Sequence, residues 1–316
     1  MSRWKTLKKI LTDRDYRTVR LAKAGVYNHL DDETYLKKLY RAKMGHPLNL
    51  DDPQLFSEKL QWLKLHDRNP LYTQLVDKYR VREYIAEKLG EEYLIPLLGV
   101  WDDPDEIDFD ALPDQFVLKC NHNSGTGMCI CRDKSKLDYE AVRKELRKGL
   151  QENFYLRNRE WPYKDVPRKI VCEQYMTDQG EADGLTDYKF FCFDGCVESV
   201  MLCIDRHMDD VKYYFFGRDW KVRKHNKRGA ACPENFTLPK PEYMEEMFSI
   251  ASSLSKGFPF VRVDLYESNG HIYVGELTLY PTGGYDANLL RDTEELFGEM
   301  INLKKVSEYE NNRISN

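Results

Sequence analysis

The chain of 316 residues lacks an apolar run long enough to cross a bilayer, which takes about 20 residues. Its first residues also lack the apolar core of a secretion signal, so we expect a cytoplasmic protein. Positive charge is not in excess either, because 48 Lys and Arg face 53 Asp and Glu and the net charge is −5. This balance gives no general nucleic-acid signature, so we expect no nucleic-acid partner.

Cysteine is present, but it does not have the spacing of a metal site. The eight cysteines form no paired CxxC motifs, and most of them lie within apolar, strand-like segments. Thiols of cytosolic proteins usually stay reduced. We therefore expect buried, reduced thiols, with neither a cysteine metal site nor disulfides.

The first part of the chain is basic. Residues 1–43 contain twelve Lys or Arg and five Asp or Glu, so they carry +7 while the remainder carries −12. Trp4, Leu7, Ile10 and Leu11 have helical spacing among basic residues, which is typical of a helix that lies on an anionic membrane surface. A helix docked on its own domain has the same composition, and this interpretation is favoured. Peripheral contact of residues 1–12 with the inner face of a membrane is the alternative.

Helical spacing continues through residues 31–45 and 53–66. Asp77 is expected to cap a further helix that runs to Leu89 and ends at Gly90. We therefore expect residues 1–105 to form a mainly helical N-terminal region with no evident chemistry of its own.

The pattern changes after Leu112. Residues 113–119 have the pattern of a strand that ends in Lys119, and residues 128–131 that of a second strand. The loop between them, Cys120-Asn-His-Asn-Ser-Gly-Thr-Gly127, consists of small and polar residues whose backbone N–H groups could surround a phosphate. It is not a Walker A loop, because no Gly-Lys-Ser/Thr opens a helix there, and a flexible hairpin turn is the alternative. The role of His122 stays open between base, ligand and hydrogen-bonding group.

Strands and helices then alternate. We expect a charged helix at 138–153, an exposed loop at 154–168, a strand at 169–173, a hairpin at 187–204 and a helix at 241–256. Lys189 alternates with aromatic residues, so it should emerge from the sheet face opposite Tyr188 and Phe190. Protection of an edge strand is the other explanation for this lysine.

A second hairpin, residues 260–280, organises the rest of the chain. Arg262 and Asp264 share one face of its first strand, and Glu276 and Thr278 share one face of its second strand. If a tight turn pairs the strands closely, the two acids converge and require a cation or a proton between them. Their hard oxygens favour Mg²⁺, which often bridges carboxylates and phosphates. Two ordinary solvated acids are the alternative, although the glycine-rich loop that follows favours a site.

Together these segments resemble the ATP-grasp superfamily. Phe116-Val-Leu-Lys-Cys-Asn-His-Asn-Ser-Gly125, Asp187-Tyr-Lys-Phe-Phe-Cys-Phe-Asp-Gly195 and the 260–284 hairpin are most similar to the TupA-like ATP-grasp family, which is associated with bacterial cell-surface polysaccharide and teichuronopeptide synthesis. The last hairpin also resembles that of D-alanine–D-alanine ligases. The resemblance implies an α/β (α+β) ATP-grasp fold in which two α/β subdomains close on the nucleotide. The implied parts are the helical region 1–105, a nucleotide-lid subdomain 106–176, a catalytic subdomain 177–300 and a polar tail 301–316.

By position, the resemblance gives each candidate residue a role. Lys119 and Lys189 would contact the ATP phosphates, and Arg262 would face the reacting carboxyl group, so Lys189 and Arg262 are the implied catalytic residues. Three further sets are implied: a closing loop (Ser124, Gly125, Gly127), an adenine hinge (Glu173, Gln174, Met176) and Mg²⁺ ligands (Asp264, Glu276, with Thr278 beside them). Ligases usually carry Asn where this chain has Thr278. A hydroxyl is a poorer cation ligand than an amide carbonyl, so a second metal site is in doubt.

The implied activity is that of an ATP-dependent carboxylate–amine ligase. ATP would convert a carboxylate into an acyl phosphate, and an amine would displace the phosphate to leave an amide, ADP and phosphate. A glycan uronic acid and an amino acid or amine are the implied substrates, in cell-surface polysaccharide or capsule synthesis. An ATP-grasp kinase, a nucleotide-sugar glycosyltransferase and a non-catalytic nucleotide-binding partner of a polysaccharide complex are the alternatives.

Overall fold

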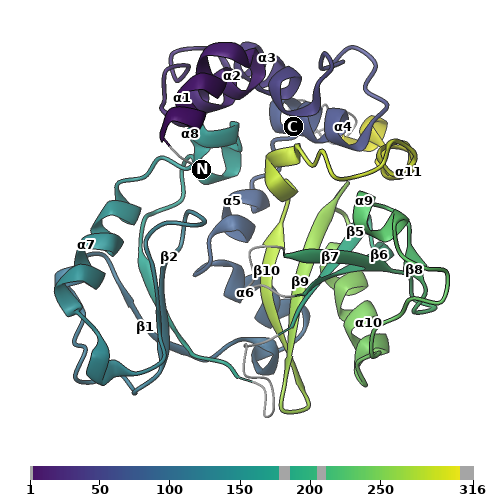
Figure 1. Cartoon of the computed structure of the whole chain (residues 1–316). Helices are drawn as coiled ribbons and strands as arrows, with labels where there is room; N and C mark the ends of the chain where they lie inside the picture. Colours follow the sequence, from purple (N-terminus) through teal and green to yellow (C-terminus); the bar gives the residue numbers. More distant parts are fainter. Residues whose placement is uncertain (1–2, 178–185, 205–210, 307–316) are drawn as a thin grey trace, which may run out of the picture.

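The chain folds into two antiparallel sheets flanked by helices (Figure 1). The computed structural model describes residues 3–177, 186–204 and 211–306, and for residues 3–7 it describes the backbone alone. One sheet has four strands and the other has six. This is the mixed α/β architecture that the sequence predicts.

The first four helices of the chain are α1 (Arg3–Thr12), α2 (Arg14–Lys23), α3 (Asp32–Met44) and α4 (Phe56–His66). An aspartate precedes two of them. The Asp13 carboxylate accepts the Tyr16 N–H before α2, and the Asp31 carboxylate accepts the Thr34 N–H before α3. In the part of the chain that the structure describes, no helix has both the length and the apolar character needed to span a bilayer.

Two short helices follow, α5 (Leu71–Val76) and α6 (Val81–Lys88). Figure 1 shows both of them between the two sheets. The predicted helix over 77–89 therefore begins later than expected. Asp77 ends α5, and its carboxylate accepts the N–H groups of Tyr79 and Arg80, which turns the chain before α6 starts.

The four-stranded sheet contains β1 (Leu97–Trp101), β2 (Phe116–Cys120), β3 (Met128–Cys131) and β4 (Ile170–Gln174), in the order β1-β4-β2-β3. The sequence predicts the last three of these strands but not β1. Helix α7 (Tyr139–Leu150) begins after Asp138, whose carboxylate accepts the Ala141 N–H. Its buried Val142 and Leu146 pack with Leu118 in a small separate core.

The six-stranded sheet contains β5 (Asp187–Phe193), β6 (Cys196–Ile204), β7 (Lys212–Phe216), β8 (Val222–Arg223), β9 (Val261–Ser268) and β10 (His271–Thr278), in the order β10-β9-β5-β6-β7-β8. Helix α10 (Met244–Ser255), which begins slightly after the expected start, covers one face. There Phe190 meets Phe248 edge to face, with ring centroids 5.2 Å apart. Strand β5 lies between β9 and β6, so the edge-strand explanation of Lys189 is wrong.

A bulge in the β9–β10 hairpin decides where Glu276 points. The pairing is regular from the turn as far as Val274. The register then shifts, so that Gly275 has no partner and Glu276 lies opposite Asp264. With regular pairing, Glu276 would oppose Val263 and its side chain would point to the face that α10 covers.

Residues 154–168, predicted as an exposed loop, are partly buried. They contain α8 (Tyr155–Asn158) and the buried Arg159 and Glu160. Arg159 donates to three carbonyls in the α2–α3 connection, and its guanidinium lies 4.4 Å from the centroid of the Tyr35 ring. The prediction of exposure is wrong because the partners of these polar side chains lie far away in the sequence.

The remaining elements are short. They are α9 (Lys227–Ala230), α11 (Arg291–Met300) and 3-10 turns at Glu91–Tyr93, Pro104–Glu106, Lys134–Lys136, Trp161–Tyr163 and Pro281–Gly284. Helix α11 packs against α4 at the top of Figure 1. The side chains of Trp4 and Leu7, and residues 307–316 of the expected polar tail, lie outside the described residues.

Five of the cysteines are buried: Cys120, Cys131, Cys172, Cys192 and Cys203. Burial raises the pKa of Cys120, Cys172 and Cys192 to about 12, which leaves them un-ionised and unreactive at neutral pH. The expectation of buried thiols is confirmed for these positions.

Candidate active site

Asp264 and Glu276 face each other across β9 and β10. Arg262 donates to both carboxylate oxygens of Asp264, from Nε at 2.6 Å and from Nη2 at 2.7 Å. The same Nη2 donates to the Thr278 hydroxyl at 3.0 Å, and this hydroxyl donates to Glu276 at 2.8 Å. These four residues therefore form one connected group on the sheet face opposite α10.

The pKa values of this group shift in different directions. Burial raises the pKa of Asp264 above its ordinary value, although Arg262 and Lys189 act to lower it. Burial alone would lower the pKa of Arg262, but the Asp264 carboxylate outweighs it and raises that pKa above its ordinary value. Burial alone would raise the pKa of Glu276, but Lys78, Arg262 and the Thr278 hydroxyl lower it below its ordinary value. Glu276 is therefore a carboxylate at neutral pH.

Lys189 lies between two buried acids. Its amine is 2.7 Å from Asp264 Oδ2 and 2.5 Å from Asp187 Oδ2. The lysine side chain is 13% exposed, whereas those of the two aspartates are 2% and 1% exposed. Asp187 is a site residue that the sequence analysis missed, although its place two residues before Lys189 on β5 puts both on one face.

In the four-stranded sheet, Lys119 and Glu173 form a second ion pair. Their Nζ and Oε2 atoms are 2.6 Å apart, and the side chains are 19% and 10% exposed. The neighbouring strands β2 and β4 bring them together. Gln174 is exposed at the end of β4 and Met176 is half-buried just beyond it. The expected adenine hinge thus begins at Glu173 in this ion pair and continues along the chain through Gln174 to Met176.

The two glycines of the small-residue loop differ in the space around them. At Gly127 (φ +63°), an added Cβ would lie 2.8 Å from the Cα of Gly149 on α7, so this glycine is needed for packing. At Gly125 (φ +81°), an added Cβ would meet no atom within 4 Å. Ser124 is exposed, and its carbonyl accepts a hydrogen bond from Arg157 at 3.0 Å. Gly125 and Ser124 therefore leave room for a ligand, whereas Gly127 does not.

Lys78 is a candidate site residue that the sequence analysis missed. Its amine donates to the Asn123 carbonyl in the small-residue loop at 2.5 Å. Burial lowers its pKa, Glu276 and Glu173 oppose this shift, and Lys119 reinforces it. Lys78 thus connects the charged groups of the two sheets. It lies between two helices, so no strand pattern or motif marks it in the sequence.

His122 lies beneath the loop. The residue is 2% exposed, and its Nε2 is 3.1 Å from the carbonyl oxygen of Glu152. Burial lowers its pKa, so the ring is neutral and its Nε2–H donates to that carbonyl. This arrangement favours a supporting role for His122 over that of a base or ligand.

The residues present fit Mg²⁺ when a substrate supplies the remaining ligands. Among the described residues, no group of three or more His, Cys, Asp or Glu could hold a metal ion. Asp264 and Glu276 offer two opposed carboxylates, which suits Mg²⁺ sites completed by substrate phosphates. Both oxygens of Asp264 already accept bonds from Arg262 and Lys189, and the Thr278 hydroxyl both accepts and donates. Glu276 is therefore the best-placed ligand and Thr278 the least suited.

A buried lysine supports the loop that follows β10. Lys64 is 1% exposed and donates to the carbonyls of Gly283 at 2.6 Å and Asn158 at 3.0 Å, and to the Gln61 side chain at 2.9 Å. Burial lowers its pKa to about 7, and the buried Glu160 opposes this shift. Lys64 and Glu160 were both missed from the sequence, where each lies in an ordinary polar context.

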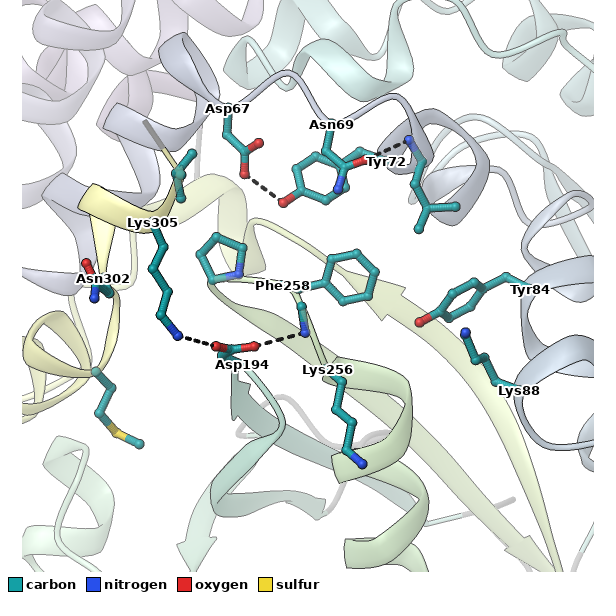
Figure 2. Close-up of a pocket in the computed structure, with 15 residues that line it drawn as sticks. Asp67, Asn69, Tyr72, Tyr84, Lys88, Asp194, Lys256, Phe258, Asn302 and Lys305 are labelled. Carbon is teal, nitrogen blue, oxygen red and sulfur yellow. Dashed lines mark hydrogen bonds and ion pairs between the residues drawn. The ribbon is translucent and has the colours of Figure 1, made fainter. Parts of the chain in front are cut away.

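Of two cavities in the described part of the chain, one is lined by expected site residues and the other is not. One of about 620 Å³ opens beside the acid pair and has Lys189 and Arg262 in its wall. Another, of about 520 Å³, is lined by none of the expected site residues (Figure 2). There Asp194 accepts from Lys305 at 3.0 Å and from the Gly257 N–H at 2.9 Å. The first cavity is thus the one that adjoins the charged group.

A family model described as TupA-like ATPgrasp matches residues 58–302 of the chain. None of the curated proteins matches the chain.

Several solved structures are similar to the chain at low identity. A D-cycloserine synthetase, DcsG, is 16% identical with a TM-score of 0.43, covering 75% of this chain and 72% of that one. A D-alanine–D-alanine ligase from Bacillus anthracis is 14% identical with a TM-score of 0.45, covering 96% of each chain. An L-amino acid ligase from Bacillus licheniformis is 14% identical with a TM-score of 0.38, covering 85% of this chain and 56% of that one. These likenesses are too distant to carry a functional conclusion.

Proposed function

The chain belongs to the TupA-like ATP-grasp family, and we propose that it is a ligase that uses ATP to join an amine to a carboxylate. The observation that carries the proposal is the group around Arg262. The Arg262 side chain is only 12% exposed, yet it lines the cavity beside the acid pair. Two hydrogen bonds to Asp264 fix its orientation before any substrate binds.

The reaction has two steps. First, a substrate carboxylate oxygen attacks the γ-phosphorus of ATP, and the bond from that phosphorus to the β,γ-bridging oxygen breaks, which gives an acyl phosphate and ADP. Second, the amine nitrogen attacks the acyl carbon, the carbon–oxygen bond to the phosphate breaks, and the nitrogen gives up a proton to water. The products are an amide, ADP and phosphate.

Each set of residues has a part in these steps. Lys119 and Lys189 balance the negative charge of the ATP phosphates, and Ser124 and Gly125 cover them, while Gly127 holds the same loop against α7. The segment from Glu173 through Gln174 to Met176 lines the adenine site. Arg262 stabilises the oxyanion that forms when the amine attacks.

Asp264 and Glu276 are the residues that would hold Mg²⁺, which neutralises phosphate charge when it is bound. Without a ligand, the three cations Arg262, Lys189 and Lys78 balance Asp264, Glu276 and Asp187. The protein thus contributes little net charge of its own, and a metal ion and the polyanionic nucleotide are expected to enter together.

More specifically, the carboxylate is that of a glycan uronic acid and the amine is that of an amino acid, within cell-surface polysaccharide synthesis. The family's association with such pathways supports this choice. The reaction takes place in the cytoplasm, where ATP is available.

A variant at Arg262 tests the proposal. ADP release is screened with uronic-acid glycans crossed with amino acids, and ATP binding is followed by calorimetry with and without Mg²⁺. Arg262→Ala should keep ATP affinity within a few-fold while amide formation falls by about a hundred-fold, because the oxyanion exists only after ATP has reacted. Arg262→Lys, which keeps the charge near Asp264, controls for loss of the fold.

Three outcomes would contradict the proposal. Absence of ATP binding would remove the ATP-grasp activity. Phosphate transfer to a hydroxyl group without amide formation would identify a kinase. Binding of UDP-sugars without ATP would identify a glycosyltransferase.

A further inference from the structure

Another cavity, of about 460 Å³, lies between α2, α3 and α8. None of the residues expected at the active site lines it, so it has no part in the proposed ligase chemistry. We propose that this cavity binds a small organic ligand with at least two negative groups, and that Lys43 and Lys23 recognise these groups. The inference does not depend on the proposed ligase function, which uses other residues.

Lys43 is a half-buried cation in the cavity wall, and its close contacts are with neutral groups. Its amine donates to the side-chain oxygen of Asn158 at 3.4 Å and lies 4.3 Å from the centroid of the Tyr285 ring. Burial lowers its pKa to about 8, and Glu160 opposes this shift. The amine is therefore still charged at neutral pH, although neither of these contacts is with a carboxylate.

The buried Glu160 does not cancel this charge. Burial raises the pKa of Glu160, and both Lys64 and Lys43 act to lower it. Two lysines thus share one glutamate whose charged form is disfavoured by its own burial. An excess of positive charge therefore remains behind the cavity wall.

The other charged residues of the wall add to this excess. Lys23 is exposed at the end of α2. Glu152 is the one acid among the described residues of the wall, and it pairs with Arg157 and accepts a hydrogen bond from the Thr126 hydroxyl. Once Glu152 and Arg157 are paired, Lys23 and Lys43 remain, and two such cations favour a ligand with two negative groups.

These lysines keep N–H donors for a ligand. An ammonium group has three N–H donors, and that of Lys43 gives one to Asn158. The others are left for carboxylate or phosphate oxygens, and charge-assisted bonds of this kind are about twice as strong as neutral ones. Both lysines also belong to residues 1–43, which carry +7 and attract anions over a longer range.

The walls of the cavity are held in place by contacts within the protein. Ala22 of α2 and Leu39 of α3 are buried in one core with Tyr35. The Tyr35 hydroxyl donates to the Arg157 carbonyl at 2.8 Å, which joins α3 to α8. Arg159 donates to three carbonyls of the α2–α3 connection. The cavity therefore has its shape before a ligand binds, which reduces the entropy lost on binding.

Size and lining indicate what joins the negative groups. A cavity of this volume is within the usual range of ligand pockets and exceeds what one inorganic ion fills. Val19, Leu39 and Leu156 contribute apolar surface to its wall, which suits a short carbon chain. The ligand class is therefore a dicarboxylate or a bisphosphate of a few carbon atoms.

A series of probes tests the inference by calorimetry at low salt, without Mg²⁺ or nucleotide. Glutarate, glutaramate and glutaramide have the same carbon chain and carry two, one and no negative charges. Glutarate should bind at least about tenfold more tightly than glutaramate, which corresponds to about 1.4 kcal/mol, and glutaramide should not bind. Propane-1,3-diyl bisphosphate is compared with glutarate to tell a phosphate site from a carboxylate site, and tighter binding of either one supports the inference.

Variants then locate the bound probe. Lys43→Met should weaken the binding of glutarate at least about tenfold, and Lys43→Arg should retain most of it. Lys23→Met alters an exposed side chain, so it should leave the fold intact and weaken binding at least about threefold. Circular dichroism checks that each variant is folded.

Lys37→Met is the matched control. Lys37 lies on the same helix as Lys43 but outside the cavity, where it pairs with Glu33 at 2.6 Å, and its replacement removes the same charge. This variant should bind glutarate within about twofold of the unaltered protein. Equal binding of glutarate and glutaramate, no binding of glutarate or the bisphosphate, or an equal loss in Lys37→Met and Lys43→Met would overturn the inference.

Discussion

The pKa of Lys78 is influenced by charged groups of both sheets, namely Glu276 of one sheet and Lys119 and Glu173 of the other. Lys78 donates to the Asn123 carbonyl at 2.5 Å, and it is the largest of the charged influences that lower the pKa of Glu276. A cation here can hold the small-residue loop and the metal-binding acid in one arrangement. We therefore regard Lys78 as part of the nucleotide site.

Replacing Lys78 should weaken nucleotide binding. Lys78→Met removes both the charge beside Glu276 and the bond to the loop, so Mg²⁺-dependent ATP affinity should fall about tenfold, or about 1.4 kcal/mol. Calorimetry measures this directly. Lys88→Met is the control, because Lys88 is exposed and lines the cavity in Figure 2. An equal loss in both variants would show that the effect is not local.

The sequence predicted those site residues whose partners lie close to them in the chain. Arg262 and Asp264 are two residues apart, and their bidentate contact follows from one strand face. Lys78 and Lys64 were not predicted because their partners are remote in the sequence; Lys64 and Gly283, for example, are 219 positions apart. No local pattern marks a lysine whose function depends on such a contact.

The β9–β10 bulge is the element that places the acid pair. Period-two alternation alone puts Glu276 on the wrong face, because a regular register from the two-residue turn pairs Gly275 with Asp264. The sequence predicted that Asp264 and Glu276 converge, but it did not predict the bulge that brings them together. Glycine suits the unpaired position, since an added Cβ at Gly275 would lie 2.3 Å from the Tyr266 ring. Strand alternation does not reveal a bulge of this kind.

The loop after β10 depends on the buried Lys64, which gives it a pH dependence. The pKa of Lys64 is lowered to about 7 in the folded chain, against an ordinary value of 10.5. Between these values the unfolded chain binds more protons, so stability rises with pH through this window. The contribution is at most about 1.4 kcal/mol per pH unit.

A comparison of variants isolates this contribution. We expect the free energy of unfolding of the unaltered protein to gain on that of Lys64→Met between pH 7 and pH 8.5, as measured by urea denaturation. Lys38→Met, at an exposed position of α3, should show no such pH-dependent difference. A constant difference between the unaltered protein and Lys64→Met across this range would mean that Lys64 does not titrate there.

At the scale of the whole molecule, the two sheets bring their charged groups to a common region. Lys119 and Glu173 come from the four-stranded sheet, and Arg262 and Asp264 come from the six-stranded sheet. Helices α5 and α6 lie between the sheets (Figure 1). Strand patterns predicted most strands of both sheets. They could not predict β1, whose short apolar segment stands alone after a helical region, or the burial of residues 154–168 against α3 and the connection that precedes it.

The N-terminal helix α1 is basic and exposes an apolar side chain. In its described side chains, Lys8 and Lys9 are exposed and Leu11 is 69% exposed, while the helix packs against α2. An apolar side chain left in water beside basic residues is the pattern of a helix that contacts anionic lipid. Each basic residue near such a surface contributes about 1 kcal/mol.

If α1 contacts anionic lipid instead of serving only its own domain, the protein should sediment with vesicles that contain anionic lipid and stay in solution with neutral vesicles. Salt should release it, because surface attraction is screened within about 10 Å at 0.1 M ionic strength. A chain without residues 1–12 should remain in solution with both kinds of vesicle, and charge reversal by Lys8→Glu with Lys9→Glu should weaken sedimentation without removing the helix. Equal sedimentation of the truncated chain would place the contact elsewhere. If the unaltered chain does not sediment at all, α1 serves only its own domain, and the excess positive charge of residues 1–43 has a purely internal role.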